Sequence, residues 1–331
     1  MKRVLNAIRK NKLLFSIIFI AFSAFLIFII SMTRKGKKEP IKIIYIAKVM
    51  DEENDFWSAL IDGAQMAAKE YNVDLTVMAP DSEEDYKKQN ELIEWAINQK
   101  PDAIALSPAN NIQTTPMANK IVENKIKLVF IDSSVNEEVE DLIVSTDNFK
   151  AGQKMGDFMM EYIKEDTKIG IVSSVETTST AIERQEGLRF ALGDEEEKIV
   201  DVVYCDSAYG KAYNLTVDLL KKHPDITMIA GLNEYSSVGA ARAIKDMKLS
   251  QKVKVIGFDS SIEQIKLLEE GVFQGLVIQK SFNMGYLGIE NAVNIVKGEK
   301  VESKIDSGSQ LITEENMYTK ENQKLLFPFL R

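Results

Sequence analysis

The sequence predicts an α/β protein with enough chain for two domains, and three observations lead to that prediction. Short β-rich runs alternate with helical patterns from residue 41 onward, which is typical of parallel sheets covered by helices. Most of these runs are continuously apolar, as expected for strands that are buried on both faces. About 290 residues follow residue 40, which is enough for two domains of ordinary size.

The first element is an uncharged apolar run at residues 13–32. As a helix with a rise of ~1.5 Å per residue it spans roughly 30 Å, the thickness of a bilayer core. The run ends in S-M-T-R without a small-residue cleavage pattern, and no lipid-accepting cysteine follows it. We therefore expect a transmembrane anchor at 13–32, between a basic cytoplasmic segment at 1–12 and a linker at 33–40. A signal peptide with an atypical cleavage site is the alternative.

Charge is divided unevenly along the chain. Residues 1–40 hold nine Lys/Arg and one acid, whereas the rest holds 32 Lys/Arg and 49 acids. Basic residues flank the apolar run on both sides, so the positive-inside rule does not decide its orientation. We place the short N-terminal end in the cytoplasm and the acidic domain outside the cell, single-pass in the cell membrane. A domain this acidic repels nucleic acid and anionic lipid.

The predicted elements follow in order along the rest of the chain. Strands are expected at 41–47, 73–80, 102–108, 126–134, 168–174, 199–207, 226–233, 253–260 and 273–279, and helices at 56–71, 84–99, 116–125, 180–192, 213–222 and 238–247. So many strands favour two sheets, with a candidate crossing between them at 142–148. The single cysteine, Cys205, rules out an internal disulfide and is expected to be a small buried hydrophobe.

Polar and aromatic residues stand where the predicted strands end. In open parallel sheets, ligands bind beyond the carboxyl ends of the strands. Carboxylates and amides suit the hydroxyls of a sugar, and rings suit its apolar faces. The alternative is that each polar residue caps the next helix. The set comprises Asn54, Asp55, Phe56, Trp57, Asp132, Ser133, Asn233, Glu234, Phe258, Asp259 and Gln279.

Several ordered motifs accompany these residues. They include N-x-F-[FW] at 54–57, D-G-A-Q at 62–65, A-x-E-R-x-E-G at 181–187, H-P-D at 223–225, G-F-D at 257–259 and K-G-E at 297–299. With these motifs, the chain from about residue 41 to about residue 313 resembles the sugar-binding type I periplasmic binding proteins, the ribose-binding members in particular.

The resemblance implies two α/β lobes that close on a sugar. It implies crossings near 145–146, 279–280 and 308–309, an N-terminal lobe at 41–145 plus 280–308, and a C-terminal lobe at 146–279 plus 309–331. The sugar contacts that it implies are Asn54, Phe56, Trp57, Asp132, Asn233, Asp259 and Gln279.

Two positions depart from the ribose-binding members. Ser133 and Ile182 stand where those members carry sugar-binding arginines, and we include Ser133 among the candidate ligand contacts. Arg184 then has a structural role, buried near the hinge side. The ligand stays open among neutral monosaccharides, either a pentose such as xylose or ribose, or a hexose.

The anchor suggests how such a domain is used. A sugar-binding domain on a membrane helix resembles the tethered binding proteins that present a sugar to a sensor histidine kinase. The alternative is the substrate-binding component of a sugar ABC transporter. Repressors with this fold need a DNA-binding headpiece, and here a membrane span occupies that place.

Binding is favoured over catalysis. The sequence shows no nucleophile–base arrangement, no phosphate-binding loop and no H-E-x-x-H pattern, so we expect no enzyme, cofactor or metal. His223 is expected to be structural, and the acids Glu83 and Glu84 to lie on a solvated face. A glycosidase that uses Asp132 and Asp259 is a remote alternative.

Overall fold

The structure is a computed structural model that describes Met1, Phe19, residues 22–23, Phe25 and residues 39–326. It divides into two compact units, Met1–Pro40 and Ile41–Arg331. Within the described residues, no helix has both the length and the apolar character to cross a bilayer. Most of the anchor predicted at 13–32, and of the segments beside it, lies outside the described residues.

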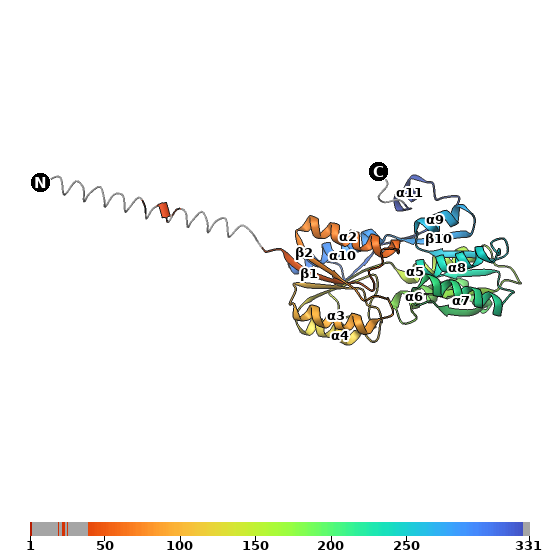
Figure 1. The fold of residues 1–331 in the computed structure, drawn as a ribbon, viewed down its shortest axis with the longest axis horizontal. Coiled ribbons are helices and arrows are strands. Elements are labelled where there is room, and N and C mark those ends of the chain that lie inside the picture. The colour runs from red at the N-terminus through yellow and green to blue at the C-terminus, as the bar shows by residue number, and fades with distance from the viewer. Residues whose placement is uncertain (2–18, 20–21, 24, 26–38, 327–331) are drawn as a thin grey trace. The chain divides into compact units, whose positions relative to one another are not determined.

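The second unit begins with a lobe built on a six-stranded sheet (Figure 1). The strand order is β11-β5-β4-β3-β1-β2, and every neighbouring pair is parallel. The strands are β1 (Ile41–Ile46), β2 (Val73–Met78), β3 (Ala103–Leu106), β4 (Lys127–Ile131), β5 (Leu142–Ser145) and β11 (Lys304–Asp306), and the helices are α2 (Asp55–Tyr71), α3 (Tyr86–Asn98), α4 (Thr115–Glu123) and α10 (Ser281–Val296).

The other lobe repeats this plan with the order β12-β10-β9-β8-β6-β7. Its edge strand β12 is antiparallel to β10, the one pair among the described residues that departs from the expected parallel sheets. The strands are β6 (Ile169–Ser173), β7 (Ile199–Tyr204), β8 (Met228–Gly231), β9 (Lys254–Phe258), β10 (Phe273–Gln279) and β12 (Ser309–Ile312), and the helices are α5 (Asn148–Met160), α6 (Ser179–Leu192), η1 (Gly193–Lys198), α7 (Tyr209–Lys222), α8 (Glu234–Asp246), α9 (Ile262–Glu269) and α11 (Lys320–Leu326). The predicted two-lobe α/β class is confirmed.

The chain passes between the two sheets three times, after β5, after β10 and after β11. Hydrogen bonds tie these passages together. Thr146 Oγ1 donates to Gln279 Oε1 at 2.8 Å and lies 3.3 Å from Ser307 Oγ, while the Ser307 amide donates to the Ser145 carbonyl at 2.9 Å. The three passages therefore form one hinge region.

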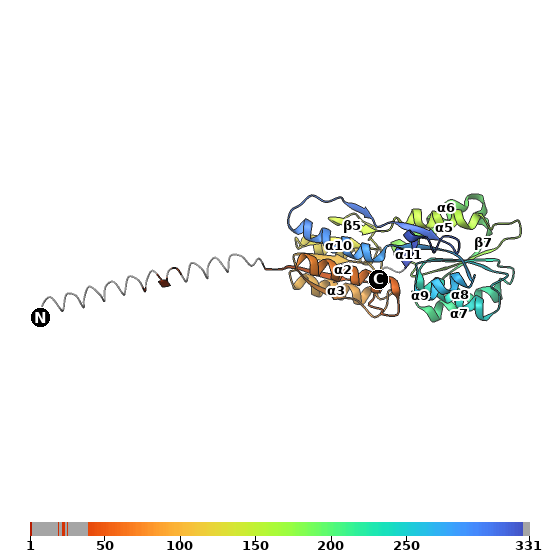
Figure 2. The same ribbon diagram turned by 90° about the horizontal axis from the view of Figure 1, so that it is seen from above.

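Close helix pairs fix the position of α2, whose N-terminus faces the other lobe. A Cβ at Gly63 in α2 would lie 2.0 Å from the Phe282 carbonyl oxygen in α10, and one at Gly187 in α6 would lie 1.9 Å from the Phe149 carbonyl oxygen in α5. Figure 2 shows α10 beside α2. These helices thus approach each other almost backbone to backbone, and glycine permits the approach.

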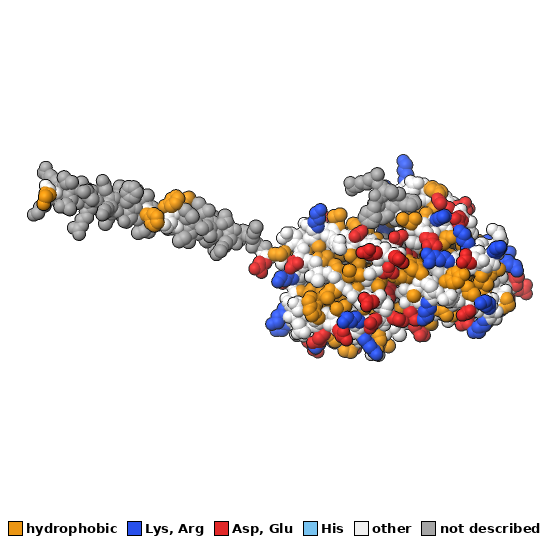
Figure 3. Space-filling view, in the orientation of Figure 1, with side chains coloured by type: hydrophobic (Ala, Val, Ile, Leu, Met, Phe, Trp, Pro, Cys, Tyr) orange, Lys and Arg blue, Asp and Glu red, His pale blue; other side chains and the backbone are white. Residues whose placement is uncertain are grey.

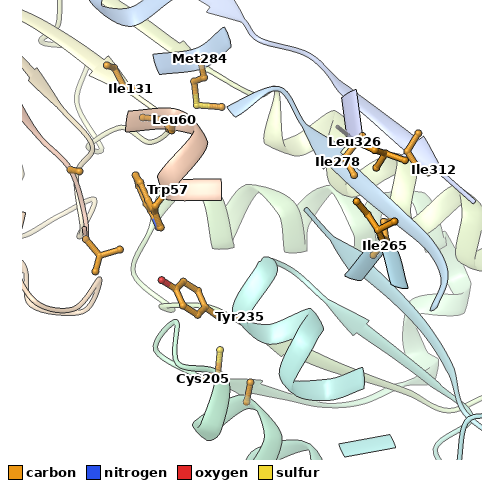
Figure 4. Packing of buried hydrophobic residues seen from close by; sticks show 14 of the residues in the cluster. Trp57, Leu60, Ile131, Cys205, Tyr235, Ile265, Ile278, Met284, Ile312 and Leu326 are labelled. Atoms are coloured by element: carbon orange, nitrogen blue, oxygen red, sulfur yellow. The ribbon is translucent and has the colours of Figure 1, made fainter. Parts of the chain in front are cut away.

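Buried apolar side chains from both lobes form the largest core cluster. Figure 4 shows part of it, with Trp57 from the first lobe and Tyr235 from the second. Cys205 is free and fully buried, so its expected role as a small hydrophobe is confirmed. Burial raises the pKa of its thiol to about 11, which keeps it protonated and unreactive.

Candidate functional site

The two lobes enclose a small cavity at the carboxyl ends of their strands. Its volume of ≈ 30 Å³ holds only a water or two, because side chains from both lobes fill the space. The lining residues are Lys48, Asn54, Phe56, Trp57, Glu83, Asp132, Ser174, Thr180, Arg184, Asn233, Glu234, Tyr235, Asp259 and Gln279. Seven of the eight candidate residues are among them.

Ser133 is the candidate that the cavity does not include. Its hydroxyl donates to the Pro108 carbonyl oxygen at 3.0 Å, and the residue is 1% exposed. The short Ser133 side chain forms its hydrogen bond with the neighbouring loop and does not reach the cavity. Ser133 therefore lies outside the cavity lining in this arrangement, and its role as a ligand contact stays a prediction.

Asp132 and Asp259 occupy equivalent places in the two lobes. Each follows a central strand, β4 or β9, and donates its amide to the next strand at 2.9 Å, to Val144 and Val277 respectively. Both have left-handed backbone, with φ of 72° and 73°, a conformation that Asp tolerates better than most residues. The bend turns both carboxylates into the cavity.

A buried ion pair holds Asp132. Lys48 Nζ lies 2.7 Å from Asp132 Oδ2, and the two side chains are only 3% and 4% exposed. The same ammonium lies 5.9 Å from the centre of the Trp57 ring. Sequence reasoning missed Lys48, although a lone lysine just after an apolar strand was a usable signal.

Asp259 is the centre of a second buried group. Its carboxylate accepts from Gln279 Nε2 at 2.7 Å and from the Glu234 amide at 2.9 Å. Burial raises its pKa, and the nearby Arg184 guanidinium opposes that rise. Arg184 itself is 4% exposed, donates to Asn148 Oδ1 and the Leu232 carbonyl oxygen at 2.8 Å each, and also lines the cavity.

Glu83 connects the first lobe to the second. It accepts from Trp57 Nε1 at 2.5 Å and from the Ser207 hydroxyl of the other lobe at 2.7 Å, and it is 7% exposed. Burial raises its pKa, and Lys48 is the largest opposing influence. The expectation that Glu83 lies on a solvated face is therefore wrong, because the indole and hydroxyl donors satisfy it inside the protein.

Glu234 makes the second carboxylate link across the cleft. It accepts from the backbone amides of Asp55 and Phe56 at 3.2 and 3.0 Å, in the first turn of α2, and from the Tyr209 hydroxyl at 2.6 Å. These hydrogen bonds join a carboxyl group of the second lobe to the start of a helix in the first lobe, so the contact links the two lobes. The residue is 1% exposed.

Two candidate amides also cap helices, as the alternative interpretation anticipated. Asn54 Oδ1 accepts from the Trp57 amide at the start of α2, and Asn233 Oδ1 accepts from the Ser236 amide at the start of α8. The Asn54 amide nitrogen donates across the cleft to the Tyr209 hydroxyl at 3.4 Å, whereas the Asn233 amide nitrogen donates within the second lobe to the Ser207 hydroxyl at 3.3 Å. Capping and cavity lining therefore coexist in the same residues.

The cavity lining thus carries four carboxylates, two cations, amides and aromatic rings. Phe56 and Trp57 meet edge to face with ring centres 5.2 Å apart. Within the described residues, no group of acids, histidines or cysteines is arranged to hold a metal ion. Such a lining provides many hydrogen-bonding groups and flat apolar faces for a polar, uncharged ligand.

Closure of the cleft is expected to depend on pH through Glu234. Burial, aided by Asp259, raises its pKa from 4.5 to about 8 in this arrangement, against hydrogen bonds from Tyr209 and the α2 amides. A raised pKa means that closing the cleft favours the protonated acid, so closure is most stable at low pH and loses stability as the pH rises toward 8.

Ligand affinity should therefore fall between pH 5 and pH 8, and Glu234→Gln should flatten the profile. Part of the pH dependence of the affinity should remain in that variant, because burial also raises the pKa values of Glu83 and Asp259. Titration calorimetry at several pH values measures both profiles. An affinity that rises with pH in the wild type contradicts this assignment.

Comparison with known proteins shows which protein family the chain resembles. The model of the periplasmic binding protein domain matches residues 46–300. A ribose import binding protein from Haemophilus influenzae is 28% identical over 263 residues, which are 79% of this chain and 88% of that protein. The D-ribose/D-allose-binding protein of Pseudomonas aeruginosa is 26% identical over 315 residues, or 92% and 96% of the two chains.

Solved structures show the same fold. A sugar transporter from Clostridium phytofermentans is 49% identical with a TM-score of 0.79, covering 83% of this chain and 99% of its own. A carbohydrate transporter solute binding protein from Agrobacterium radiobacter, in complex with D-arabinose, is 28% identical with a TM-score of 0.83, covering 88% and 100%.

Proposed function

The chain belongs to the periplasmic binding protein domain family, and from that premise we propose that it binds a neutral monosaccharide between its lobes. The observation that carries the proposal is the convergence of Asp132, Asp259 and Trp57 on one cavity between the lobes. Adjacent hydroxyls of a sugar donate to carboxylates, while an indole face packs against its C–H groups. The binding domain acts outside the cell.

The sugar takes over hydrogen bonds that protein groups make in this arrangement. The cavity of ≈ 30 Å³ is much smaller than usual ligand sites of about 300 Å³ or more, so the lobes open before a sugar enters. On closure, sugar hydroxyls replace partners such as Gln279 at Asp259. Hinge closure of two domains around a ligand is a common mode of conformational change.

The cation beside Asp132 and the ligands named for relatives both bear on the class of sugar that is bound. Ser133 turns away from it, whereas Lys48 supplies a cation to Asp132 from the end of β1. At this end of the site the cationic hydrogen-bond donor is therefore the lysine ammonium group, which acts as a point charge. It is not the planar guanidinium group of an arginine, which can donate two parallel hydrogen bonds. Relatives named for ribose and allose, and one solved with D-arabinose, support a pentose such as ribose or xylose, or a hexose.

Binding without catalysis is the proposed activity. A glycosidase needs one carboxylic acid to protonate the leaving group and a second carboxylate as base or nucleophile. Here Lys48 holds Asp132, and Gln279 together with a backbone amide holds Asp259. These partners keep both acids as hydrogen-bond acceptors, which a binding site requires.

We further propose that the apolar run at 13–32 anchors the protein in the membrane and that the closed lobes engage a sensor histidine kinase. Phe19, Phe22 and Phe25, which are helical, expose more than half of their side chains, which suits contact with lipid. A tether raises the effective concentration of the domain near a membrane partner. Presentation of the sugar to an ABC permease is the alternative, supported by a relative named a ribose import binding protein and by a solved structure named a sugar transporter.

Deletion of the gene separates the two uses. If the protein serves a kinase, the deletion abolishes sugar-induced transcription, while uptake through an already expressed transporter stays largely intact. Lost uptake with intact induction contradicts the signalling proposal and supports the transport alternative. Full-length chain in carbonate-washed membranes is the expected companion result, and its release by the wash contradicts the anchor.

A further inference from the structure

The Trp57 ring is held by a carboxylate that sequence reasoning placed on a solvated face. Trp57 Nε1 donates to Glu83 Oε1 at 2.5 Å, and both side chains line the cavity between the lobes. The ring is 2% exposed, and Figure 4 shows it at the start of α2. A buried indole N–H needs an acceptor, so the position of Glu83 determines how the ring lies.

Glu83 uses its two carboxylate oxygens for partners in different lobes. Oε1 accepts from the Trp57 indole of its own lobe, and Oε2 accepts from the Ser207 hydroxyl of the second lobe at 2.7 Å. Glu83 itself lies in the loop between β2 and α3. Because each oxygen has its own donor, the carboxylate cannot rotate without losing a hydrogen bond. Its orientation therefore depends on both lobes.

Ser207 reaches Glu83 from a turn with an unusual backbone. Asp206 and Ser207 have φ of 50° and 53°, a left-handed conformation that is unfavourable for residues other than glycine. The Ser207 hydroxyl also accepts from Asn233 Nδ2 at 3.3 Å. A hydroxyl accepts one hydrogen bond while it donates another. The turn thus presents the Ser207 proton to the first lobe.

We propose that Glu83 is a positioning residue of the sugar site: it fixes the orientation of the Trp57 ring, and Ser207 fixes Glu83 when the lobes close. This inference rests on the proposed sugar-binding function. Because the indole N–H donates to Glu83, it is not available to a sugar hydroxyl, and Trp57 meets the sugar with its apolar ring. Lobe closure sets the orientation of this stacking surface through one carboxylate.

The indole N–H signal of Trp57 measures the positioning in the full-length chain in detergent, without sugar. The chain has two tryptophans, and Trp95 lies on α3, away from the cavity lining. Trp95→Phe therefore leaves a single indole signal in a heteronuclear NMR spectrum. All variants for this measurement are made in that background, so the signal is assigned without ambiguity.

Glu83→Ala should speed the exchange of this N–H with water about tenfold, because a buried donor loses its acceptor. Glu83→Gln keeps an oxygen that accepts, and it should restore slow exchange. Glu84→Ala is the matched control, since it removes the next acid along the chain, which is exposed. It should leave the exchange rate unchanged. Equal exchange rates in Glu83→Ala and Glu84→Ala overturn the proposal.

Sugar affinity, measured by calorimetry, tests the part that Ser207 takes. Ser207→Gly removes the hydroxyl, and glycine suits the left-handed backbone of the turn, so the turn itself is kept. This variant should bind the sugar about fivefold more weakly. Asp206→Asn changes the neighbouring residue of the same turn, and Asn also tolerates this backbone. It should leave the affinity unchanged. Equal affinities in the two variants overturn the role of Ser207.

A double-mutant cycle tests whether Glu83 acts through Trp57. Glu83→Ala should weaken sugar binding about tenfold, and Glu83→Gln should recover most of the loss. In Trp57→Phe there is no indole N–H to hold, so the same Glu83→Ala change should cost much less. Fully additive losses contradict the positioning role. If the chain binds no monosaccharide, the proposed function fails, while indole exchange in the sugar-free chain still decides whether Glu83 positions Trp57.

Discussion

Replacing Asp132 by Asn is expected to lower the free energy of unfolding by about 3 kcal/mol, because it leaves a buried lysine charge without its partner. Lys48 and Asp132 lie 2.7 Å apart and are almost fully buried. Asn retains the left-handed backbone that Asp132 adopts, so backbone strain does not add to the loss. Guanidinium unfolding of the variant and the wild type measures the difference.

The double variant Lys48→Met with Asp132→Asn separates charge from packing. Removing both charges leaves no unpaired ion, so the double variant should recover most of the stability that Asp132→Asn loses. Asp141→Asn is a matched control, since its partner Lys127 is 47% exposed and surface pairs contribute about 0–1 kcal/mol. A loss at Asp132 no larger than at Asp141, or a double variant as unstable as the single one, contradicts a buried pair at this site.

Replacing Asp259 by Asn is expected to weaken monosaccharide binding more than about tenfold while the fold stays intact. The carboxylate accepts two hydrogen bonds inside the cleft and balances the buried Arg184. A neutral amide loses a charged acceptor for sugar hydroxyls, and hydrogen bonds to charged groups contribute about 1.5–3 kcal/mol each. Calorimetric titration of the variant with the ligand of the wild type gives the change directly.

Two controls accompany this measurement. Asp246→Asn makes the same chemical change at an exposed acid at the far end of α8. His223→Ala alters a histidine that ends α7, 3.5 Å from Asp201. Both should change affinity less than about threefold. Wild-type affinity in Asp259→Asn shows that the site has been placed wrongly, and a large loss in His223→Ala reopens the question of catalysis.

The sequence predicted the fold class because the strands of both sheets are continuous apolar runs separated by helical patterns. The helices α5, α9, α10 and α11 were not predicted. The buried face of α10 repeats at helical spacing but includes Gly285 and Gly288, and glycine weakens a helical signal, while α9 has only eight residues. The position of α10 in the first lobe depends on its close contact with α2, which joins residues far apart in the chain.

Part of the cavity lining was predictable and part was not. Asp132 and Asp259 follow apolar strands directly, so the carboxyl ends of the strands revealed them. Glu83 lies in a polar stretch between β2 and α3, and only the folded structure brings it to the Trp57 indole and Ser207. Arg184 was expected to be only structural, yet it borders the cavity while its hydrogen bonds hold it in place.

The surface of the binding domain agrees with a small uncharged ligand. Acidic and basic side chains are interspersed over the face shown in Figure 3, without a broad basic patch. Nucleic acid requires such a patch to neutralise its phosphates. The polar groups of the two lobes meet instead at the small cavity between them.

Calorimetric titration of the chain from residue 39 onward with a panel of neutral pentoses and hexoses tests the central claim most directly. We expect one sugar to bind with one site per chain, with heat released and a melting temperature that rises with sugar concentration. A ligand at 100 times its dissociation constant should stabilise the protein by about 2.7 kcal/mol. No heat and no change in melting temperature with any pentose or hexose at millimolar concentration would contradict sugar binding by this cleft.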